Sequence, residues 1–324
     1  MMARAVRGAG RTYLPASLRK PPRFPGAIRH PSPGILVQMS DEFFLAPAAV
    51  RRSFDRAART YDAAAAVPTE IRNRLLERLD IVRLQPQAVL DLGAGTGHAS
   101  KALKQRYRAA EVIALDLSPA MLVAADRQQS WLRRFHRVTA DAHRLPLKDA
   151  SVELVFSNLM LEWCHDPDTV FQEIRRVLKP GGLLSFATLG PDTLRELRQA
   201  WREVDGYTHV HRFIDMHDWG DALMRAGLAE PVMDTERLTV TYADADALMR
   251  ELVASGARNI AGGRARGLTS KARLESLRRG LAPDSRGALP ISVEVVYGHA
   301  WAGQLRRPRG IEKEIRVPVS SLKR

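Results

Sequence analysis

Residues 89–97 read VLDLGAGTG, an apolar run that leads into three glycines, each separated from the next by one residue. The run predicts a buried strand, and Ala99, Leu103 and Tyr107 follow at helical spacing, so we expect a strand, a tight turn and a helix. Glycine suits such a turn because it tolerates positive φ and lets a ligand lie close to the backbone. The segment therefore predicts a ligand site at the end of a strand.

Asp116 ends the next apolar run, residues 112–115, at the spacing expected of a ribose-binding acid. Its carboxylate is expected to accept hydrogen bonds from two ribose hydroxyls. The glycines follow G-x-G-x-G rather than the G-x-G-x-x-G of dinucleotide sites, and no lysine follows them as in a P-loop. The pattern favours a nucleoside ligand without phosphates. A glycine-rich turn in another kind of parallel-sheet protein is the alternative.

Further segments follow in the order expected for an open α/β sheet. Residues 152–158 predict a strand with Ser157 and Asn158 at its carboxyl end, where such sheets bind ligands. An amphipathic helix then precedes the Lys-Pro-Gly-Gly sequence at 179–182, which we expect to end the helix before a strand at 183–187. Several ordered landmarks are much harder to obtain by chance than one glycine turn.

Together these segments resemble the class I methyltransferases that use S-adenosylmethionine. The resemblance implies a doubly wound, Rossmann-like α/β sheet with helical cap insertions, and S-adenosylmethionine as cosubstrate. It places Asp141 where the family has an acid that contacts the adenine amino group. The implied cofactor-binding residues are Asp91, Gly93, Ala94, Gly95, Gly97, Asp116, Leu117, Asp141, Ala142, Ser157 and Asn158.

Length and charge divide the chain unevenly. Its 324 residues are enough for one large α/β domain with additions. Residues 1–39 hold seven basic and no acidic residues, and so contribute half of the net charge of +14. This leader is rich in proline and glycine and lacks apolar periodicity, so we interpret it as disordered. A translation start at Met39 and a mitochondrial transit peptide are the alternatives. We expect the methyltransferase domain over 40–302 and a flexible tail over 303–324.

Cysteine and histidine usage argues against disulfides and metals. Cys164 is the only cysteine, which excludes an internal disulfide and fits a reducing cytoplasm. No histidine has partners at metal-ligand spacing, so we assign no metal. No apolar run approaches the twenty residues of a membrane span.

A more specific resemblance covers residues 50–302. The segments are similar to the family of malonyl-carrier-protein O-methyltransferases of biotin synthesis, which implies methyl transfer from S-adenosylmethionine to the free carboxylate of malonyl-acyl carrier protein. The segments that carry this likeness are SFDRAARTYD at 53–62, LDLSPAML at 115–122, SNL at 157–159, EWC at 162–164 and HVHRF at 209–213.

One segment keeps a competing activity open. The sequence TLGPDTLREL at 188–197 also occurs in similar form in a related mitochondrial complex I assembly factor, which hydroxylates an arginine. A methyltransferase acting on RNA or a small molecule, and a noncatalytic binding protein, are further alternatives.

The implied reaction makes small demands on acid and base residues. A malonyl carboxylate is already ionised at neutral pH, so we nominate no general base. Arg212 is expected to clamp this carboxylate, because a guanidinium binds a carboxylate in a fixed plane. Tyr61, on a helix expected over 50–79 that folds over the cofactor, is placed near the reacting group. Core packing of Tyr61 and a surface position of Arg212 are the alternatives. We expect the acceptor pocket to be shaped by Phe54, Trp163 and His211.

The region after the core sheet is expected to supply a cap within 198–285. We predict helices and a connection over 198–226, a strand over 232–242, and a helix whose first turn is capped by Asp244. Residues 290–301 predict the last strand. The basic surface suits acyl carrier protein, which is acidic, as partner. Because the chain has no recognisable RNA-binding module, we expect no nucleic-acid partner. We also expect no membrane association, a monomer and a cytoplasmic location.

Overall fold

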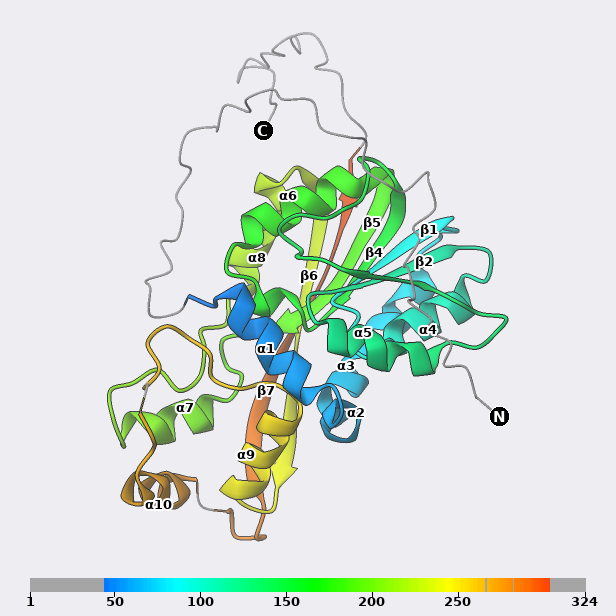
Figure 1. The fold of residues 1–324 in the computed structure, drawn as a ribbon. Coiled ribbons are helices and arrows are strands. Elements are labelled where there is room, and N and C mark those ends of the chain that lie inside the picture. Colours follow the sequence, from blue (N-terminus) through cyan, green and yellow to red (C-terminus); the bar gives the residue numbers. More distant parts are fainter. Residues whose placement is uncertain (1–43, 266, 282, 304–324) are drawn as a thin grey trace, which may run out of the picture.

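The computed structural model describes residues 44–265, 267–281 and 283–303. Its centre is a seven-stranded sheet in the order β3-β2-β1-β4-β5-β7-β6, with helices on both faces (Figure 1). This architecture confirms the predicted doubly wound α/β sheet. The predictions for the leader at 1–39 and for the tail after Gly303 lie outside the described residues.

The strands form a parallel sheet with one reversed member. β7 pairs antiparallel with both β5 and β6, whereas β1 to β5 are joined by parallel ladders. Every residue of β1 is buried, as expected for a strand covered on both faces. The strands are β1 (Ala88–Leu92), β2 (Glu111–Asp116), β3 (His136–Thr139), β4 (Val152–Asn158), β5 (Leu178–Leu189), β6 (Leu228–Tyr242) and β7 (Leu289–Ala302).

Side-chain caps fix the starts of several helices. Asp244 accepts a hydrogen bond from the Ala247 amide at 2.6 Å, which confirms the cap predicted for α9. The α-helices are α1 (Pro47–Ala57), α2 (Tyr61–Ala64), α3 (Ala66–Glu77), α4 (His98–Arg106), α5 (Pro119–Ala125), α6 (Pro167–Val177), α7 (Arg195–Arg202), α8 (Met216–Arg225), α9 (Ala245–Ala254) and α10 (Lys271–Gly280). Short 3-10 helices are η3 (Arg78–Ile81), η4 (Asp126–Gln128) and η5 (Leu161–Trp163).

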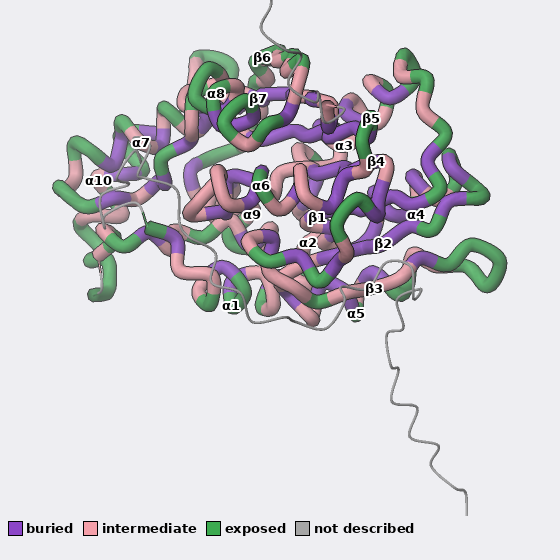
Figure 2. Tube along the Cα trace, turned by 90° about the horizontal axis from the view of Figure 1, so that it is seen from above, coloured by how far each residue is buried: buried purple, intermediate pink, exposed green. Residues whose placement is uncertain are grey.

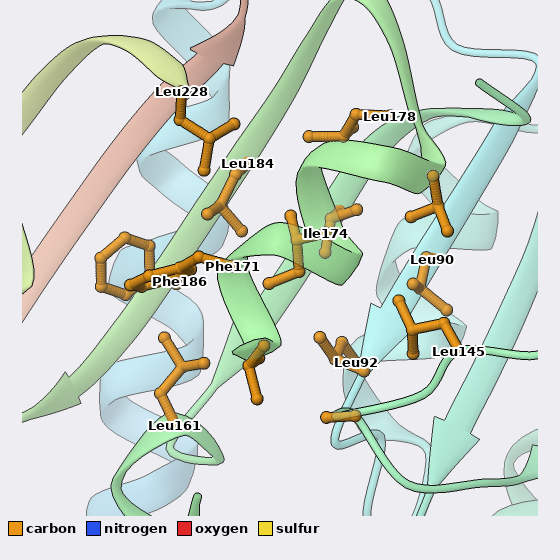
Figure 3. Packing of buried hydrophobic residues seen from close by; sticks show 14 of the residues in the cluster. Leu90, Leu92, Leu145, Leu161, Phe171, Ile174, Leu178, Leu184, Phe186 and Leu228 are labelled. Atoms are coloured by element: carbon orange, nitrogen blue, oxygen red, sulfur yellow. The ribbon is translucent and has the colours of Figure 1, made fainter. Parts of the chain in front are cut away.

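Two apolar clusters lie on opposite faces of the sheet. On one face, α6 and α8 pack against strand residues, and Figure 3 shows Phe171 and Ile174 of α6 beside Leu184 and Phe186 of β5. On the other face, α3, α4 and α5 cover the alternate residues of the same strands. Seen from above, the buried stretches follow the strands through the middle of the molecule (Figure 2). Burial on both faces explains the nearly continuous apolar runs of the sequence.

The predicted single helix over 50–79 is wrong, because this segment forms three helices and a 3-10 turn. The first break follows Ala57, whose carbonyl accepts hydrogen bonds from both the amide and the hydroxyl of Thr60. The second break precedes α3, where Pro68 lies in the first turn and cannot continue a helix backward. These breaks let the N-terminal segment bend over the carboxyl ends of the strands.

The Lys-Pro-Gly-Gly sequence departs in part from its prediction. It ends α6 as expected, but it already belongs to β5, which begins at Leu178 rather than 183. The pairing with β4 shifts between Val152 and Leu154, so these residues form an irregularity in the ladder. Gly181 adopts a φ of +78° there, which a side chain would disfavour.

Helices α7, α9 and α10 form the predicted cap at one end of β6 and β7 (Figure 1). They share an apolar cluster in which Trp201, Leu248 and Leu277 pack with Ile291 of β7. Among the described residues, no helix is long and apolar enough to cross a membrane.

Trp219 of α8 offers a test of this packing. It is 1% exposed and its ring lies 5.7 Å from that of Phe171. We expect Trp219→Ala to lower the free energy of unfolding by about 3–5 kcal/mol, because a large buried side chain is lost and a cavity remains. Urea unfolding followed by circular dichroism measures the change. Met224→Ala on the exposed face of the same helix should shift it by less than about 0.5 kcal/mol. Equal losses in the two variants would contradict this assignment of the core.

Candidate functional site

The glycine turn joins β1 to α4 in a left-handed conformation. Gly95 has a φ of +51°, and a Cβ added to it would meet no atom within 4 Å, so its face is open. Gly97 has a φ of +83°, and a Cβ there would lie 2.7 Å from the Cβ of Ala125. Gly95 therefore leaves room for a ligand, whereas Gly97 lets α5 approach the turn.

Asp116 is locked in place at the end of β2. Its two carboxylate oxygens accept hydrogen bonds from the amides of Gly95 and Ser118, both at 2.8 Å. A carboxylate has about four lone-pair positions, so these bonds leave acceptor capacity for a ligand. Burial raises the pKa of Asp116 to about 6, and the two backbone bonds oppose this rise.

The turn and Asp116 line a cavity of about 750 Å³, which we term the glycine-turn cavity. Its wall is mainly apolar with a few polar groups, as in small-molecule sites. The residues proposed from the sequence that line it are Phe54, Tyr61, Gly93, Gly95, Asp116, Leu117, Asp141, Ala142, Asn158 and Trp163.

Asp141 follows β3 on the wall of this cavity. One of its oxygens accepts hydrogen bonds from the amide of His143 at 2.9 Å and is 2.6 Å from the His143 Nδ1. The bond to the His143 ring lowers the pKa of Asp141, so this carboxylate stays ionised at neutral pH. It can accept a hydrogen bond from an amino group.

A smaller polar cavity adjoins the glycine-turn cavity. It is lined by Asp91, Ala94 and Arg72, among others. Burial raises the pKa of Asp91 to about 7, and Ser100 donates a hydrogen bond to its carboxylate. The buried side-chain Oδ1 of Asn158, which lines both cavities, has no hydrogen-bond partner among the described residues. This cavity therefore offers both signs of charge and an unused acceptor.

Arg72 carries no signal in the sequence that marks it as a site residue. It lies on α3, where an arginine at helical spacing gives no signal that separates it from a surface residue. Burial lowers its pKa, and the charges of Asp91 and Asp62 oppose this effect. Only the fold brings α3 beside the end of β1.

Two proposed cofactor residues do not line either cavity. Ser157 is fully buried, and its hydroxyl donates to the carbonyl of Leu92 at 2.9 Å, which ties β4 to β1. Gly97 faces Ala125 rather than the open space. These two predictions of ligand contact are corrected to structural roles, because neighbouring elements cover both residues.

A second cavity of about 1040 Å³, which we term the apolar chamber, shares a wall with the glycine-turn cavity. Its other walls come from the start of α7, the end of α9, the segment 209–213 and β7. Four residues line both cavities and mark their junction, namely Phe54, Tyr61, Leu159 and Trp163.

Aromatic rings shape the junction. The ring of Trp163 contacts Phe54 at 5.0 Å and His211 at 4.8 Å between centroids, in both cases edge to face. His211 is buried, and its Nδ1 has no hydrogen-bond partner in the part of the chain that the structure describes. Burial lowers the pKa of His211 to about 4, so the free imidazole is neutral at neutral pH.

Tyr61 begins α2 and separates the two cavities. Removal from water raises its pKa above the ordinary range, and the nearby charges of Asp116 and Glu162 add to this effect. Its phenol is therefore neutral at any physiological pH. It can donate one hydrogen bond at the junction.

The predicted clamp residue Arg212 does not reach the chamber. Its side chain is exposed and lines a separate surface cavity with Trp201 and Arg202. Its neighbours His211 and Phe213 are buried and line the chamber, whereas Arg212 is exposed. The prediction that Arg212 contacts the chamber is therefore corrected.

Comparison with known proteins supports an enzyme of the methyltransferase class. Residues 90–186 match a family described as a methyltransferase domain. A malonyl-acyl-carrier-protein O-methyltransferase from Methylovorus sp. is 53% identical over 280 residues, which cover 82% of this chain and 93% of the relative. An enzyme of the same name from Halorhodospira halophila is 50% identical, with 85% and 95% covered.

Solved structures support the fold alone. The YcgJ protein from Bacillus subtilis has a TM-score of 0.52 at 16% identity, covering 72% of this chain and 99% of that protein. Phosphoethanolamine N-methyltransferase 2 from Haemonchus contortus has a TM-score of 0.50 at 19% identity, covering 79% of this chain and 60% of that protein.

Asp116 provides a test of the glycine-turn cavity. We expect Asp116→Asn to raise the dissociation constant for S-adenosylmethionine about 10- to 100-fold, because a hydrogen bond to a charged group contributes about 1.5–3 kcal/mol. Isothermal titration calorimetry measures it. The unaltered protein should also bind S-adenosylmethionine more weakly at pH values below 6, because Asp116 becomes protonated. Asp126→Asn, at an exposed carboxylate, is the matched control. Unchanged affinity in Asp116→Asn would contradict the ribose assignment.

Proposed function

Because the chain belongs to the malonyl-acyl-carrier-protein O-methyltransferase family, we propose that it methylates the free carboxylate of malonyl-acyl carrier protein, using S-adenosylmethionine. The product is the malonyl methyl ester that primes pimelate synthesis for biotin. The arginine-hydroxylase alternative has no specific observation in its favour, since relatives matched over four fifths of the chain are O-methyltransferases by name.

The observation that carries the proposal is the junction of two cavities of different character. One has a glycine turn and a fixed carboxylate suited to a nucleoside, and the other has an apolar wall. A methyl group passed between two ligands requires that they meet with their reacting atoms in line. The shared wall of Phe54, Tyr61, Leu159 and Trp163 supports such a meeting.

The chain's own residues fit S-adenosylmethionine by chemistry. Gly95 leaves open space beside the turn, Asp116 keeps acceptor capacity for ribose hydroxyls, and Asp141 is an ionised acceptor for the adenine amino group. We propose that the polar cavity takes the amino-acid end. There Arg72 would pair with its carboxylate, and Asp91 with Asn158 would accept from its ammonium group.

The proposed reaction depends on position rather than on proton transfer. When bound, S-adenosylmethionine supplies an activated methyl group on a sulfonium sulfur. The acceptor carboxylate is ionised at neutral pH, so the residues have only to orient it and exclude water. Tyr61 and His211 each offer a hydrogen bond at the chamber wall, and Phe54 and Trp163 exclude water at the junction. Such positioning contributes about 7–11 kcal/mol to catalysis.

Because Arg212 lies at the surface, we propose that it binds the partner protein instead of clamping the substrate carboxylate. Arg202 and Arg212 line the surface cavity beside the chamber, and neither has a hydrogen bond or ion pair with the described residues. The aspartates of this surface cavity are partly engaged in other contacts, because Asp205 pairs with His209 and Asp215 caps α8. We propose that these two free arginines attract the acidic surface of acyl carrier protein.

The single cysteine, which cannot form an internal disulfide, suits the cytoplasmic location that we propose. We further propose a monomer that acts without a nucleic-acid partner.

A mass-spectrometric assay tests the reaction. Purified full-length protein with S-adenosylmethionine should add one methyl group to malonyl-acyl carrier protein. Acetyl-acyl carrier protein, which lacks the free carboxylate, should stay unmodified. Methylation of both substrates, or of neither despite measurable binding of S-adenosylmethionine, would overturn the proposed function.

The surface arginines give a separate prediction. The double variant Arg202→Glu/Arg212→Glu should raise the KM for malonyl-acyl carrier protein about three- to tenfold at low salt and weaken its salt dependence. The KM for malonyl-pantetheine, which lacks the carrier protein, should not change. Arg279→Glu reverses an exposed charge on α10 and is the matched control. An equal effect on both substrates would instead place these arginines in the acceptor site.

A further inference from the structure

Glu162 is a buried carboxyl group for which the mechanism above has no use. It lies in η5, directly after β4, and is 9% exposed. Its Oε2 accepts a hydrogen bond from the hydroxyl of Thr188 at 3.0 Å. The side chain lines the apolar chamber and adjoins Trp163, which marks the junction of the two cavities.

No cation neutralises Glu162 among the described residues. Its only side-chain partner there is Thr188, and none of the ion pairs includes it. An ionised carboxylate in apolar surroundings is costly, so the acid form is favoured. Burial accordingly raises the pKa of Glu162 to about 7, which puts its titration in the physiological range.

The other titratable groups around the chamber are neutral or paired with another residue, which leaves Glu162 as the group that titrates. Tyr61 on α2 is a neutral phenol, and Cys164 beside it is a neutral thiol, because burial raises both pKa values above their ordinary ranges. His211 on the segment 209–213 is neutral because burial lowers its pKa. On the far wall, Tyr242 of β6 and Glu251 of α9 are hydrogen-bonded to each other at 2.8 Å. His209 pairs with Asp205 on the outer side.

The proposed substrate carries a negative charge into this chamber. A malonyl carboxylate next to an ionised Glu162 would place two like charges in a medium that screens them poorly. The same carboxylate next to the acid form would instead accept a short, charge-assisted hydrogen bond. The protonation state of Glu162 thus decides whether the chamber repels or holds the acceptor.

Resting on the proposed function, we propose that Glu162 is a specificity-determining residue, which in its acid form donates a hydrogen bond to the acceptor carboxylate. If the free enzyme has Glu162 ionised, binding takes up one proton from solvent. That proton stays on Glu162 throughout, because methyl transfer only breaks the sulfur–carbon bond and forms the oxygen–carbon bond. The ester product has lost its charge and accepts a weaker hydrogen bond, which favours its release.

The proposal predicts how affinity depends on pH. Only the acid form binds well, and it falls from about nine tenths of the enzyme at pH 6 to about one tenth at pH 8 for the value near 7. The KM for malonyl-acyl carrier protein should therefore rise about tenfold between pH 6 and pH 8. The KM is to be measured at saturating S-adenosylmethionine, because the pKa of Asp91, about 7, makes the affinity for that ligand depend on pH over the same range.

Glu162→Gln tests the proposal directly, because glutamine keeps the shape and a donor but cannot ionise. At pH 8 its KM for malonyl-acyl carrier protein should fall to near the value of the unaltered enzyme at pH 6, with a flat profile. The exposed Glu203→Gln on the cap is the matched control and should keep the original profile. A Glu162→Gln variant that keeps the pH-dependent KM, or whose KM rises at every pH while S-adenosylmethionine still binds, would overturn the proposal.

Proton uptake gives a second readout that does not depend on turnover. Titration calorimetry of malonyl-acyl carrier protein into enzyme loaded with S-adenosylhomocysteine, in buffers of different ionisation enthalpy, should show about half a proton taken up at pH 7. Glu162→Gln should lose this uptake. If the unaltered enzyme does not methylate malonyl-acyl carrier protein even at pH 6, the proposed function fails. If it does so with a flat KM profile, only the role of Glu162 fails.

Discussion

The carboxylate of Asp116 is the constraint on which the site depends. It accepts one backbone amide from the glycine turn after β1 and one from the turn after β2, and so holds two strand ends in fixed relation. The bond from the glycine turn forms where Gly95 adopts a positive φ, a conformation that glycine tolerates best. The cavity for a nucleoside, the position of α5 and the first turn of α4 follow from this arrangement. Binding and folding thus rely on the same few backbone donors.

Three carboxyl groups of the site are removed from water by burial. Asp91, Asp116 and Glu162 lie at or near the carboxyl ends of strands, and burial raises the pKa of each. Asp116 accepts hydrogen bonds from the backbone amides of Gly95 and Ser118, whereas Glu162 is supported by its own backbone amide and by the hydroxyl of Thr188. This difference in hydrogen bonding suits Asp116 to accept a hydrogen bond from a ligand and suits Glu162 to donate one. Position in the sheet alone would not distinguish them.

The N-terminal helices and the cap convert a bare sheet into an enclosed site. Ser118 donates a hydrogen bond to Asp55 of α1 at 2.6 Å, and the hydroxyl of Ser53 donates to the carbonyl of Gly256 at 2.9 Å. Segments 63 and 203 residues apart in the sequence therefore close over the strand ends. Water exclusion, which a methyl transfer to a charged oxygen requires, comes from these long-range contacts.

The sequence by itself predicted the doubly wound sheet and indicated a nucleoside ligand at the glycine turn. Apolar runs, glycine spacing and caps act through near neighbours, so residues such as Gly95, Asp116 and Asp244 could be interpreted locally. Tertiary structure alone decided that Arg212 turns outward while His211 turns inward, that Ser157 and Gly97 are covered, and that Arg72 and Glu162 face cavities. The physical reason is that burial and side-chain direction depend on which distant elements pack together, and no local pattern records that packing.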